Sequence, residues 1–137
     1  LWAALEIAQA ADFVLAMPEG LEAPIAQGGT TVSGGQRQRL AIARALVKRP
    51  EIYVFDDSFS ALDTATDARL RAALRREVAD ATLIVVAQRV ATVQNADQII
   101  VLDQGRVVGR GTHDELLASN PTYVEIVDSQ LRAEASA

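Results

Sequence analysis

The chain has 137 residues, half of them hydrophobic, and a formal net charge of −5 from 13 basic and 18 acidic side chains. A chain of this length can form one compact core, and its acidic balance excludes an electrostatic footprint for a nucleic-acid backbone or an anionic membrane surface. The lack of cysteine excludes disulfides, thiolate metal sites and cysteine nucleophiles, and it fits a reducing cytoplasm.

The N-terminal segment predicts two short helices followed by a loop. Apolar residues recur at helical spacing over residues 1–17, and an irregular stretch follows from Pro18 to Thr31. The first residues resemble the interior of a helix, without an initiator methionine or a signal-like region, so we expect a fragment of a longer protein. The longest apolar runs, 82–87 and 99–102, fall well short of the roughly 18 residues that span a bilayer. Any membrane part is therefore expected outside this chain.

The best-defined helix in the sequence covers residues 34–48. Ser33 and Gln36 fit the S-x-x-Q capping box that opens a helix. At the other end, Lys48 and Arg49 suit the negative pole of the helix dipole, and Pro50 prevents its continuation.

A strand, a helix and a second strand follow, which favours an α/β fold with a parallel sheet. Residues 52–55 form a continuous apolar run, as expected of a strand that is buried on both faces. Asp63 would cap a helix over residues 64–78, and residues 82–87 make the next buried strand. Asp56 and Asp57 come at the carboxyl end of the first strand, where open α/β sheets bind their ligands.

The next segment predicts a β-hairpin that ends the sheet in antiparallel fashion. Its strands are residues 97–102 and 106–108, and the turn is Asp103-Gln104-Gly105.

Two helices complete the predicted elements. Thr112 and Glu115 fit a second capping box, which opens a short helix to Ala118. Pro121 then starts a helix toward Leu131. Residues 133–137 are expected to form a frayed tail.

One local motif indicates a contact with an anion. It places two glycines and a hydroxyl at a helix N-terminus, where free N–H groups and the positive dipole end attract a phosphate. Its residues are Ser33, Gly34, Gly35 and Gln36. A plain capped helix after a glycine turn would explain the same four residues, so the motif gains its meaning from its distance to the next ones.

The chain resembles the nucleotide-binding domain of ABC transporters. The residues that carry the resemblance are the Ser-Gly-Gly-Gln signature at 33–36, the strand ending in Asp56 and Asp57, and the Ser-Ala-Leu-Asp loop that ends at Asp63. Residues 111–117, Gly-Thr-His-Asp-Glu-Leu-Leu, are similar to a segment of exporter-type members, and Ala26-Gln27-Gly28-Gly29-Thr30 lies where exporters have the loop that touches the membrane domain.

The resemblance implies the C-terminal part of a RecA-like P-loop NTPase domain. Residues 1–49 would be the helical subdomain with the signature helix, 50–132 the second part of the ATPase core, and 133–137 a tail. No G-x-x-x-x-G-K-[ST] phosphate loop occurs in the chain, and its one lysine, Lys48, has no glycine loop around it. We therefore expect the chain alone to bind ATP very weakly and not to hydrolyse it.

The resemblance also implies residue roles, with two departures. Asp56 would help to hold Mg²⁺ through water, and Asp63 would lie at a dimer seam. Asp57 stands where active members have a glutamate that orients or deprotonates the attacking water. Because aspartate is one methylene shorter, its carboxylate is withdrawn by roughly 1.5 Å relative to that of a glutamate. A misplacement of about 1 Å can already cost a hundredfold in rate. Gln88 stands where members have a histidine, and an amide cannot relay a proton. Both changes predict a degenerate hydrolytic site.

These expectations combine in one hypothesis. ABC domains work as head-to-tail dimers, so Ser33, Gly35 and Gln36 would act in trans on ATP held by a second ABC domain, in a heterodimeric exporter. The parent protein would carry its own transmembrane domain and lie at the cytoplasmic face of the plasma membrane. Two alternatives stay open, namely a soluble ABC ATPase of the DNA-repair or translation type and a non-catalytic interaction module.

Three further features receive structural interpretations. His113 is expected to be solvated or to cap a helix, without a catalytic role. Arg69, Arg71, Arg75 and Arg76 are expected to form a solvated helix face. Trp2 and Phe13 are expected to pack within the helical subdomain.

Overall fold

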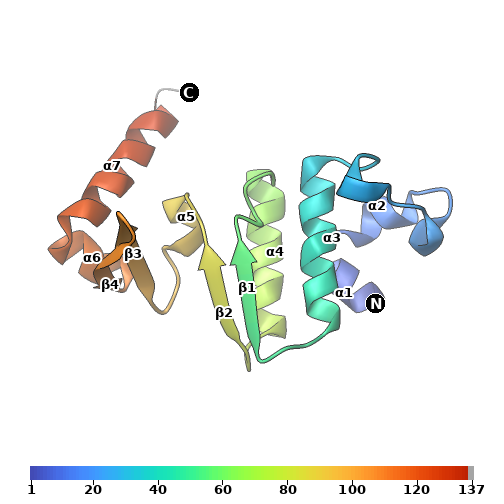
Figure 1. Cartoon of the computed structure of the whole chain (residues 1–137), viewed down its shortest axis with the longest axis horizontal. Coiled ribbons are helices and arrows are strands. Elements are labelled where there is room, and N and C mark those ends of the chain that lie inside the picture. Colours follow the sequence, from blue (N-terminus) through green and yellow to red (C-terminus); the bar gives the residue numbers. More distant parts are fainter. Residues whose placement is uncertain (136–137) are drawn as a thin grey trace. The chain divides into compact units, whose positions relative to one another are not determined.

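The computed structural model describes residues 1–135 and divides the chain into two compact units, Leu1–Val86 and Ala87–Ala137. Figure 1 shows the elements of both. The predicted boundary between a helical subdomain and an ATPase core, at residue 49, falls inside the first unit and stays a prediction.

The first unit consists of four α-helices, two short 3₁₀ helices and a pair of strands. In chain order these are α1 (Trp2–Ile7), α2 (Ala11–Leu15), η1 (Gly20–Glu22), η2 (Gln27–Gly29), α3 (Gly34–Val47), β1 (Ile52–Asp56), α4 (Thr64–Glu77) and β2 (Thr82–Val86). The two short N-terminal helices, the long helix after Ser33 and the strand–helix–strand order are as predicted. The predicted α/β class is confirmed, because β1 and β2 pair in parallel from Ile52↔Thr82 to Asp56↔Val86.

Helix starts follow the predicted capping residues. Ser33 and Gln36 form the reciprocal capping box of α3, in which Ser33 N donates to Gln36 Oε1 at 2.9 Å and Gln36 N donates to Ser33 Oγ at 3.2 Å. Asp63 opens α4 by accepting the backbone N–H of Thr66 at 2.9 Å. These side chains satisfy N–H groups that have no partner inside the helix.

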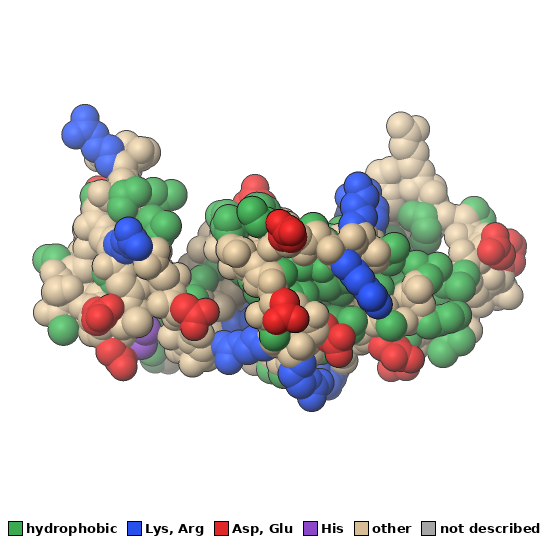
Figure 2. All heavy atoms as spheres, turned by 90° about the horizontal axis from the view of Figure 1, so that it is seen from below, with side chains coloured by type: hydrophobic (Ala, Val, Ile, Leu, Met, Phe, Trp, Pro, Cys, Tyr) green, Lys and Arg blue, Asp and Glu red, His purple; other side chains and the backbone are tan. Residues whose placement is uncertain are grey.

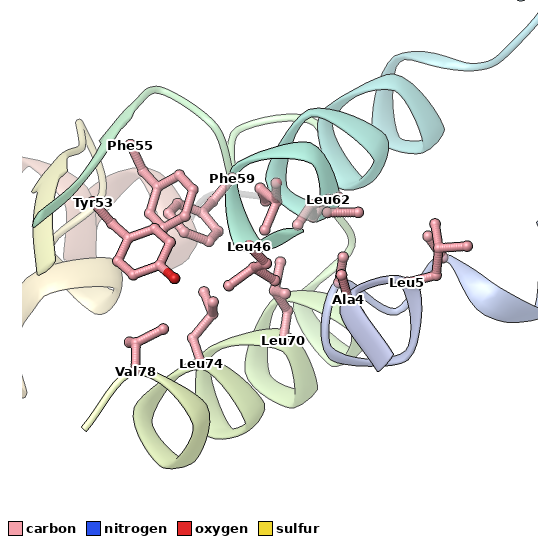
Figure 3. Packing of buried hydrophobic residues seen from close by; sticks show 14 of the residues in the cluster. Ala4, Leu5, Leu46, Tyr53, Phe55, Phe59, Leu62, Leu70, Leu74 and Val78 are labelled. Carbon is pink, nitrogen blue, oxygen red and sulfur yellow. The ribbon is translucent and has the colours of Figure 1, made fainter. Parts of the chain in front are cut away.

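The core of the first unit lies against one face of β1. Tyr53 and Phe55 point toward this side, with the rings of Phe55 and Phe59 in an edge contact 5.6 Å apart. Leu70 and Leu74 of α4 pack into the same cluster, together with Leu46 of α3 (Figure 3).

The opposite face of the sheet is exposed, so the predicted burial of both strands on two faces is wrong for the described residues. Ile52 is 59% and Val54 is 63% exposed, and Ile84 and Val86 of β2 are about half exposed. The burial alternates along β1 because the helices of this unit pack on the Tyr53–Phe55 side alone. Figure 2 shows exposed hydrophobic side chains, in green, among charged ones on one face of the molecule.

Two arginines fix the connection between α1 and α2 to the longer helices. Arg39 of α3 donates to the Gln9 carbonyl at 2.6 Å and lies 4.8 Å from the ring centre of Phe13. Arg69 of α4 donates to the Gln9 side chain at 3.3 Å, and Arg71 pairs with the buried Asp67 at 2.6 Å. Arg69 is exposed, as predicted, and also makes this contact to Gln9, whereas the predicted solvated face is wrong for Arg71, which is half-buried in its pair with Asp67.

The second unit contains α5 (Val90–Val93), β3 (Ile99–Asp103), β4 (Arg106–Gly111), α6 (His113–Ser119) and α7 (Pro121–Ala135). The predicted hairpin is confirmed, and its turn residues Gln104 and Gly105 both have positive φ, as a tight two-residue turn requires. The hairpin is a sheet of its own, so the expectation that it ends the parallel sheet is corrected. The core of this unit contains Ile99, Val101, Leu116 and Tyr123.

Other details of the second unit differ from expectation. Helix α5 was not predicted, and α7 continues to Ala135, so residues 133–135 are helical and not frayed. The rest of the predicted tail, residues 136 and 137, lies outside the described residues. His113 is half-buried, with Nδ1 2.8 Å from the hydroxyl of Tyr123, instead of being solvated. No helix in the described part of the chain is long and apolar enough to span a bilayer.

The first prediction concerns the core of the first unit. Leu74 is only 1% exposed, so Leu74→Ala should lower the free energy of unfolding by about 2–5 kcal/mol through lost burial and a cavity. Chemical unfolding followed by circular dichroism measures this. Leu15→Ala is the matched control, because Leu15 is 66% exposed. Equal losses in the two variants would contradict the packing described.

The second prediction concerns the α4 cap. Hydrogen bonds from the backbone N–H and side chain of Thr66 lower the pKa of Asp63 below its ordinary 3.8. The carboxylate therefore stabilises the fold above pH 3.8, and this contribution is lost as the pH falls through the folded-state pKa. Asp63→Asn keeps a capping side chain, so the variant should have a melting temperature close to that of the wild type at neutral pH. On acidification its melting temperature should fall less than that of the wild type, because the amide does not titrate. A steeper acid loss in the variant would argue against this linkage.

Candidate functional site

The first part of the candidate site is the start of α3. Ser33 has an extended backbone, and the helix begins at Gly34, so the N–H groups of Gly34 and Gly35 have no partner inside the helix, whereas that of Gln36 donates to Ser33 Oγ. Ser33 and Gly34 are exposed, whereas Gly35 and Gln36 are half-buried. In the capping box the side-chain oxygen Oε1 of Gln36 accepts the Ser33 N–H, which fixes this side chain at the helix start. The arrangement offers exposed N–H groups and a positive dipole end to an anion.

Gly35 is required by a close approach to the loop after β1. A Cβ atom at this position would lie 2.9 Å from the carbonyl oxygen of Ala61 and 3.7 Å from Leu62 Cδ2. The first contact is shorter than real Cβ atoms show, and backbone cannot move away as a flexible side-chain tip can. The second glycine of the motif therefore brings the start of α3 against residues 61–62.

The second part of the site is the turn that follows β1. Asp56 is the last residue of the strand, and Asp57 adopts a left-handed backbone with φ of 48° while its N–H donates to the Val86 carbonyl at 3.1 Å. Both aspartates are exposed, while Phe59 and Leu62 anchor the loop in the core. The predicted position at the carboxyl end of β1 is confirmed, and both aspartates are exposed there; their part in binding a ligand stays a prediction.

Gln38 joins the two parts. Its amide nitrogen lies 3.1 Å from the Asp57 carbonyl and 3.0 Å from Ser60 Oγ, and its amide oxygen accepts the Ala61 N–H at 2.9 Å. Sequence reasoning missed this residue, because a polar side chain two positions beyond Gln36 carries no signal of a contact some twenty residues away.

Arg37 makes a comparable link to the loop at residues 26–30. Its guanidinium donates to the Gly28 carbonyl at 2.8 Å. Gly28 and Gly29 have φ of 76° and 68°, which favours glycine, and a Cβ on Gly29 would lie 2.8 Å from Arg37 Cδ. This loop, singled out in the sequence, is therefore held against the same helix that begins at Ser33.

Asp63 lies at the end of the loop and caps α4. Hydrogen bonds from Thr66 lower its pKa below the ordinary 3.8, so the carboxylate is ionised at neutral pH and stays so further into the acid range. The loop therefore presents a fixed negative charge at this exposed position.

Gln88 belongs to the second unit, whereas the other predicted site residues belong to the first. Gln130 of α7 fixes the backbone here, since its amide nitrogen donates to the Gln88 carbonyl at 2.6 Å and its oxygen accepts the Val90 N–H at 2.8 Å. Gln130 escaped sequence reasoning for the same reason as Gln38.

The acidic pair suits a limited role toward a cation. Among the described residues, no group of three or more histidine, cysteine or acidic side chains could enclose a metal ion. Mg²⁺ needs no such cage, because proteins hold it through one or two carboxylates together with water and substrate phosphates. The exposed Asp56 and Asp57 fit that manner of binding.

Comparisons with known proteins agree on one family. Residues 5–60 match the family model described as ABC transporter. The chain is 57% identical over 130 residues to an uncharacterized ABC transporter ATP-binding protein of Mycobacterium tuberculosis (strain ATCC 25618 / H37Rv), covering 95% of this chain and 22% of that protein. It is 47% identical over 128 residues to the ATP-dependent lipid A-core flippase of Pseudomonas fluorescens (strain Pf0-1), covering 93% and 21%.

A solved structure supports the same assignment. The structure of a bacterial Atm1-family ABC exporter with ATP bound matches with a TM-score of 0.90 and 40% identity, over 94% of this chain and 23% of that one. The chain thus spans about a fifth of the length of the curated relatives it matches. Fold, sequence and motif order together place it in the ABC transporter family, as part of an ATP-binding domain.

Proposed function

We propose that this chain is part of the ATP-binding subunit of an ABC exporter and that it completes an ATP site on a second ABC domain. The observation that carries this proposal is the start of α3, where Ser33 and Gly34 are exposed and the N–H groups of Gly34 and Gly35 have no partner inside the helix. The similarity to a lipid A-core flippase and to an exporter with ATP bound supports the exporter class.

In this proposal the α3 start binds the γ-phosphate of ATP that the partner holds. Ser33, Gly34 and Gly35 supply a hydroxyl and backbone N–H groups, and Gln36 keeps the turn in shape through the capping box. Preorganised donors of this kind stabilise charge that develops on a transferring phosphoryl group. The loop through Asp63 would lie at the seam between the two domains.

The chain's own ATP site is proposed to be degenerate. Asp56 would hold Mg²⁺ through water, and the bound Mg²⁺–ATP would supply the phosphoryl group and charge neutralisation there. Asp57 offers a carboxylate at the position of the hydrolytic base, on a shorter side chain. Gln88 can donate a hydrogen bond to a phosphate oxygen, but its amide cannot take up and release a proton as a histidine can. This site would bind ATP and turn it over slowly.

An intact signature beside weakened hydrolytic residues favours an asymmetric heterodimer. The partner would then supply an efficient carboxylate and histidine for the ATP that faces Ser33. The assembly would act at the cytoplasmic face of the plasma membrane, with membrane helices supplied outside these 137 residues.

The third prediction tests the contribution in trans. In the full transporter, Ser33→Arg should lower ATP turnover on the order of a hundredfold, because the side chain fills the space of the phosphate and removes a preorganised donor. The assay is steady-state phosphate release in the purified heterodimer. Ser129→Arg makes the same change at an exposed position of α7, outside the start of α3. Near-normal turnover in Ser33→Arg would refute the role of the signature.

The fourth prediction tests the degenerate site. With the partner's catalytic carboxylate replaced by its amide, the remaining turnover reports this chain's own site. Asp57→Glu combined with Gln88→His should raise it by about a hundredfold, because carboxylate reach and proton relay are restored. The control combines Asp80→Glu with Gln98→His, both at exposed positions. An unchanged rate would mean that Asp57 and Gln88 do not limit hydrolysis.

A further inference from the structure

We infer that Gln38 is a positioning residue that ties the start of α3 to the loop at residues 57–63, so that the two move together. The inference rests on the proposed function, in which α3 contacts the partner's ATP and the loop belongs to the chain's own ATP site. Gln38 would then set the position of the signature according to the state of the loop.

The side chain of Gln38 makes three hydrogen bonds to the loop. Its nitrogen lies within hydrogen-bond distance of the Asp57 carbonyl and Ser60 Oγ, and its oxygen accepts the Ala61 N–H. Ser60 Oγ also donates to the Asp57 carbonyl at 3.1 Å, so the turn is closed on itself and tied to α3 at once. One amide thus fixes most of the turn after Asp57.

A second contact makes the link rigid. Gly35 lies three residues before Gln38, so both are on the same face of α3. At Gly35 the helix meets the Ala61 backbone so closely that no side chain fits. Gln38 and Gly35 therefore fix the loop at two points along the helix, which resists both sliding and rotation.

The geometry demands a glutamine. Asp57 O needs a donor and Ala61 N–H needs an acceptor, and the amide provides both. Glutamate has the same length and keeps the acceptor, but it has no donor for the Asp57 carbonyl. Methionine has a similar length and provides neither function to a useful degree.

The consequence is an effect on turnover more than on ATP affinity. The Gln38 side chain bonds to the Asp57 carbonyl, Ser60 Oγ and the Ala61 N–H, so its loss removes none of the groups proposed to bind phosphate. What changes is their alignment, and a misplacement of about 1 Å costs up to a hundredfold in rate. We therefore expect Gln38→Met in the full transporter to lower kcat about tenfold while KM for ATP changes less than about twofold.

The experiment measures kcat and KM for ATP in the purified heterodimer for Gln38→Met, Gln38→Glu, Ser60→Ala and the Gln38→Met/Ser60→Ala double variant. Gln98→Met, at an exposed position of the second unit, controls for the substitution itself. Both Gln38 variants should lose kcat, because both lose the donor. Ser60→Ala should lose less, and it should add little to Gln38→Met, because the two side chains act through one hydrogen-bonded turn.

The kinetic results decide whether Gln38 acts as a positioning residue. A fall in kcat with nearly constant KM, together with non-additivity, supports the inference. Unchanged kcat in Gln38→Met, or fully additive losses with Ser60→Ala, would overturn it. Ser33→Arg is measured alongside: if it retains turnover, the proposed function fails, whereas its loss combined with a normal Gln38→Met refutes the positioning role alone. Thermal melting checks that each variant is folded at the assay temperature.

Discussion

The contact between α3 and the loop after β1 is the constraint on which the rest of the site depends. Gly35 meets the Ala61 backbone where a Cβ would clash at 2.9 Å, and the Gln38 amide binds the same loop from the next turn of the helix. The residues proposed to meet the partner's ATP therefore lie in the same rigid contact as Asp57, which is proposed to meet the chain's own ATP. A shift of either would displace the other.

The hydrophobic core supports this piece from one side. Phe59 and Leu62 anchor the loop in the cluster that Tyr53, Phe55 and the α4 leucines form, so loop position follows from packing as well as from hydrogen bonds. Arg39 and Arg69 add a polar layer by holding Gln9, which fastens the two short helices to α3 and α4. The site is consequently carried by a scaffold whose parts restrain each other.

Local chemistry explains what the sequence could predict. The caps at Ser33, Asp63 and Thr112 depend on residues three positions apart, and the structure has all three. The contacts of Gln38 and Gln130 join segments some twenty or forty residues apart, and nothing in a single sequence marks such pairs. A continuous apolar run likewise indicates a strand but not which of its faces is covered, hence the wrong prediction for Ile52 and Val54. Site roles for Asp56, Asp57, Gln88 and Asp63 remain predictions that need kinetics.

The most direct test of the central claim is a cross-link across the proposed ATP sandwich. These 137 residues have no cysteine, so Ser33→Cys introduces a single thiol among them, to be paired with one cysteine in the partner's phosphate loop, with any cysteine elsewhere in the transporter replaced by serine. A disulfide can form only when the two Cα atoms come within about 7 Å and the Cβ atoms point toward each other. Cross-linking in the full transporter should rise strongly when Mg²⁺–ATP is added and remain low without nucleotide. A yield that is independent of ATP, or a cross-link only between two copies of this chain, would contradict the account.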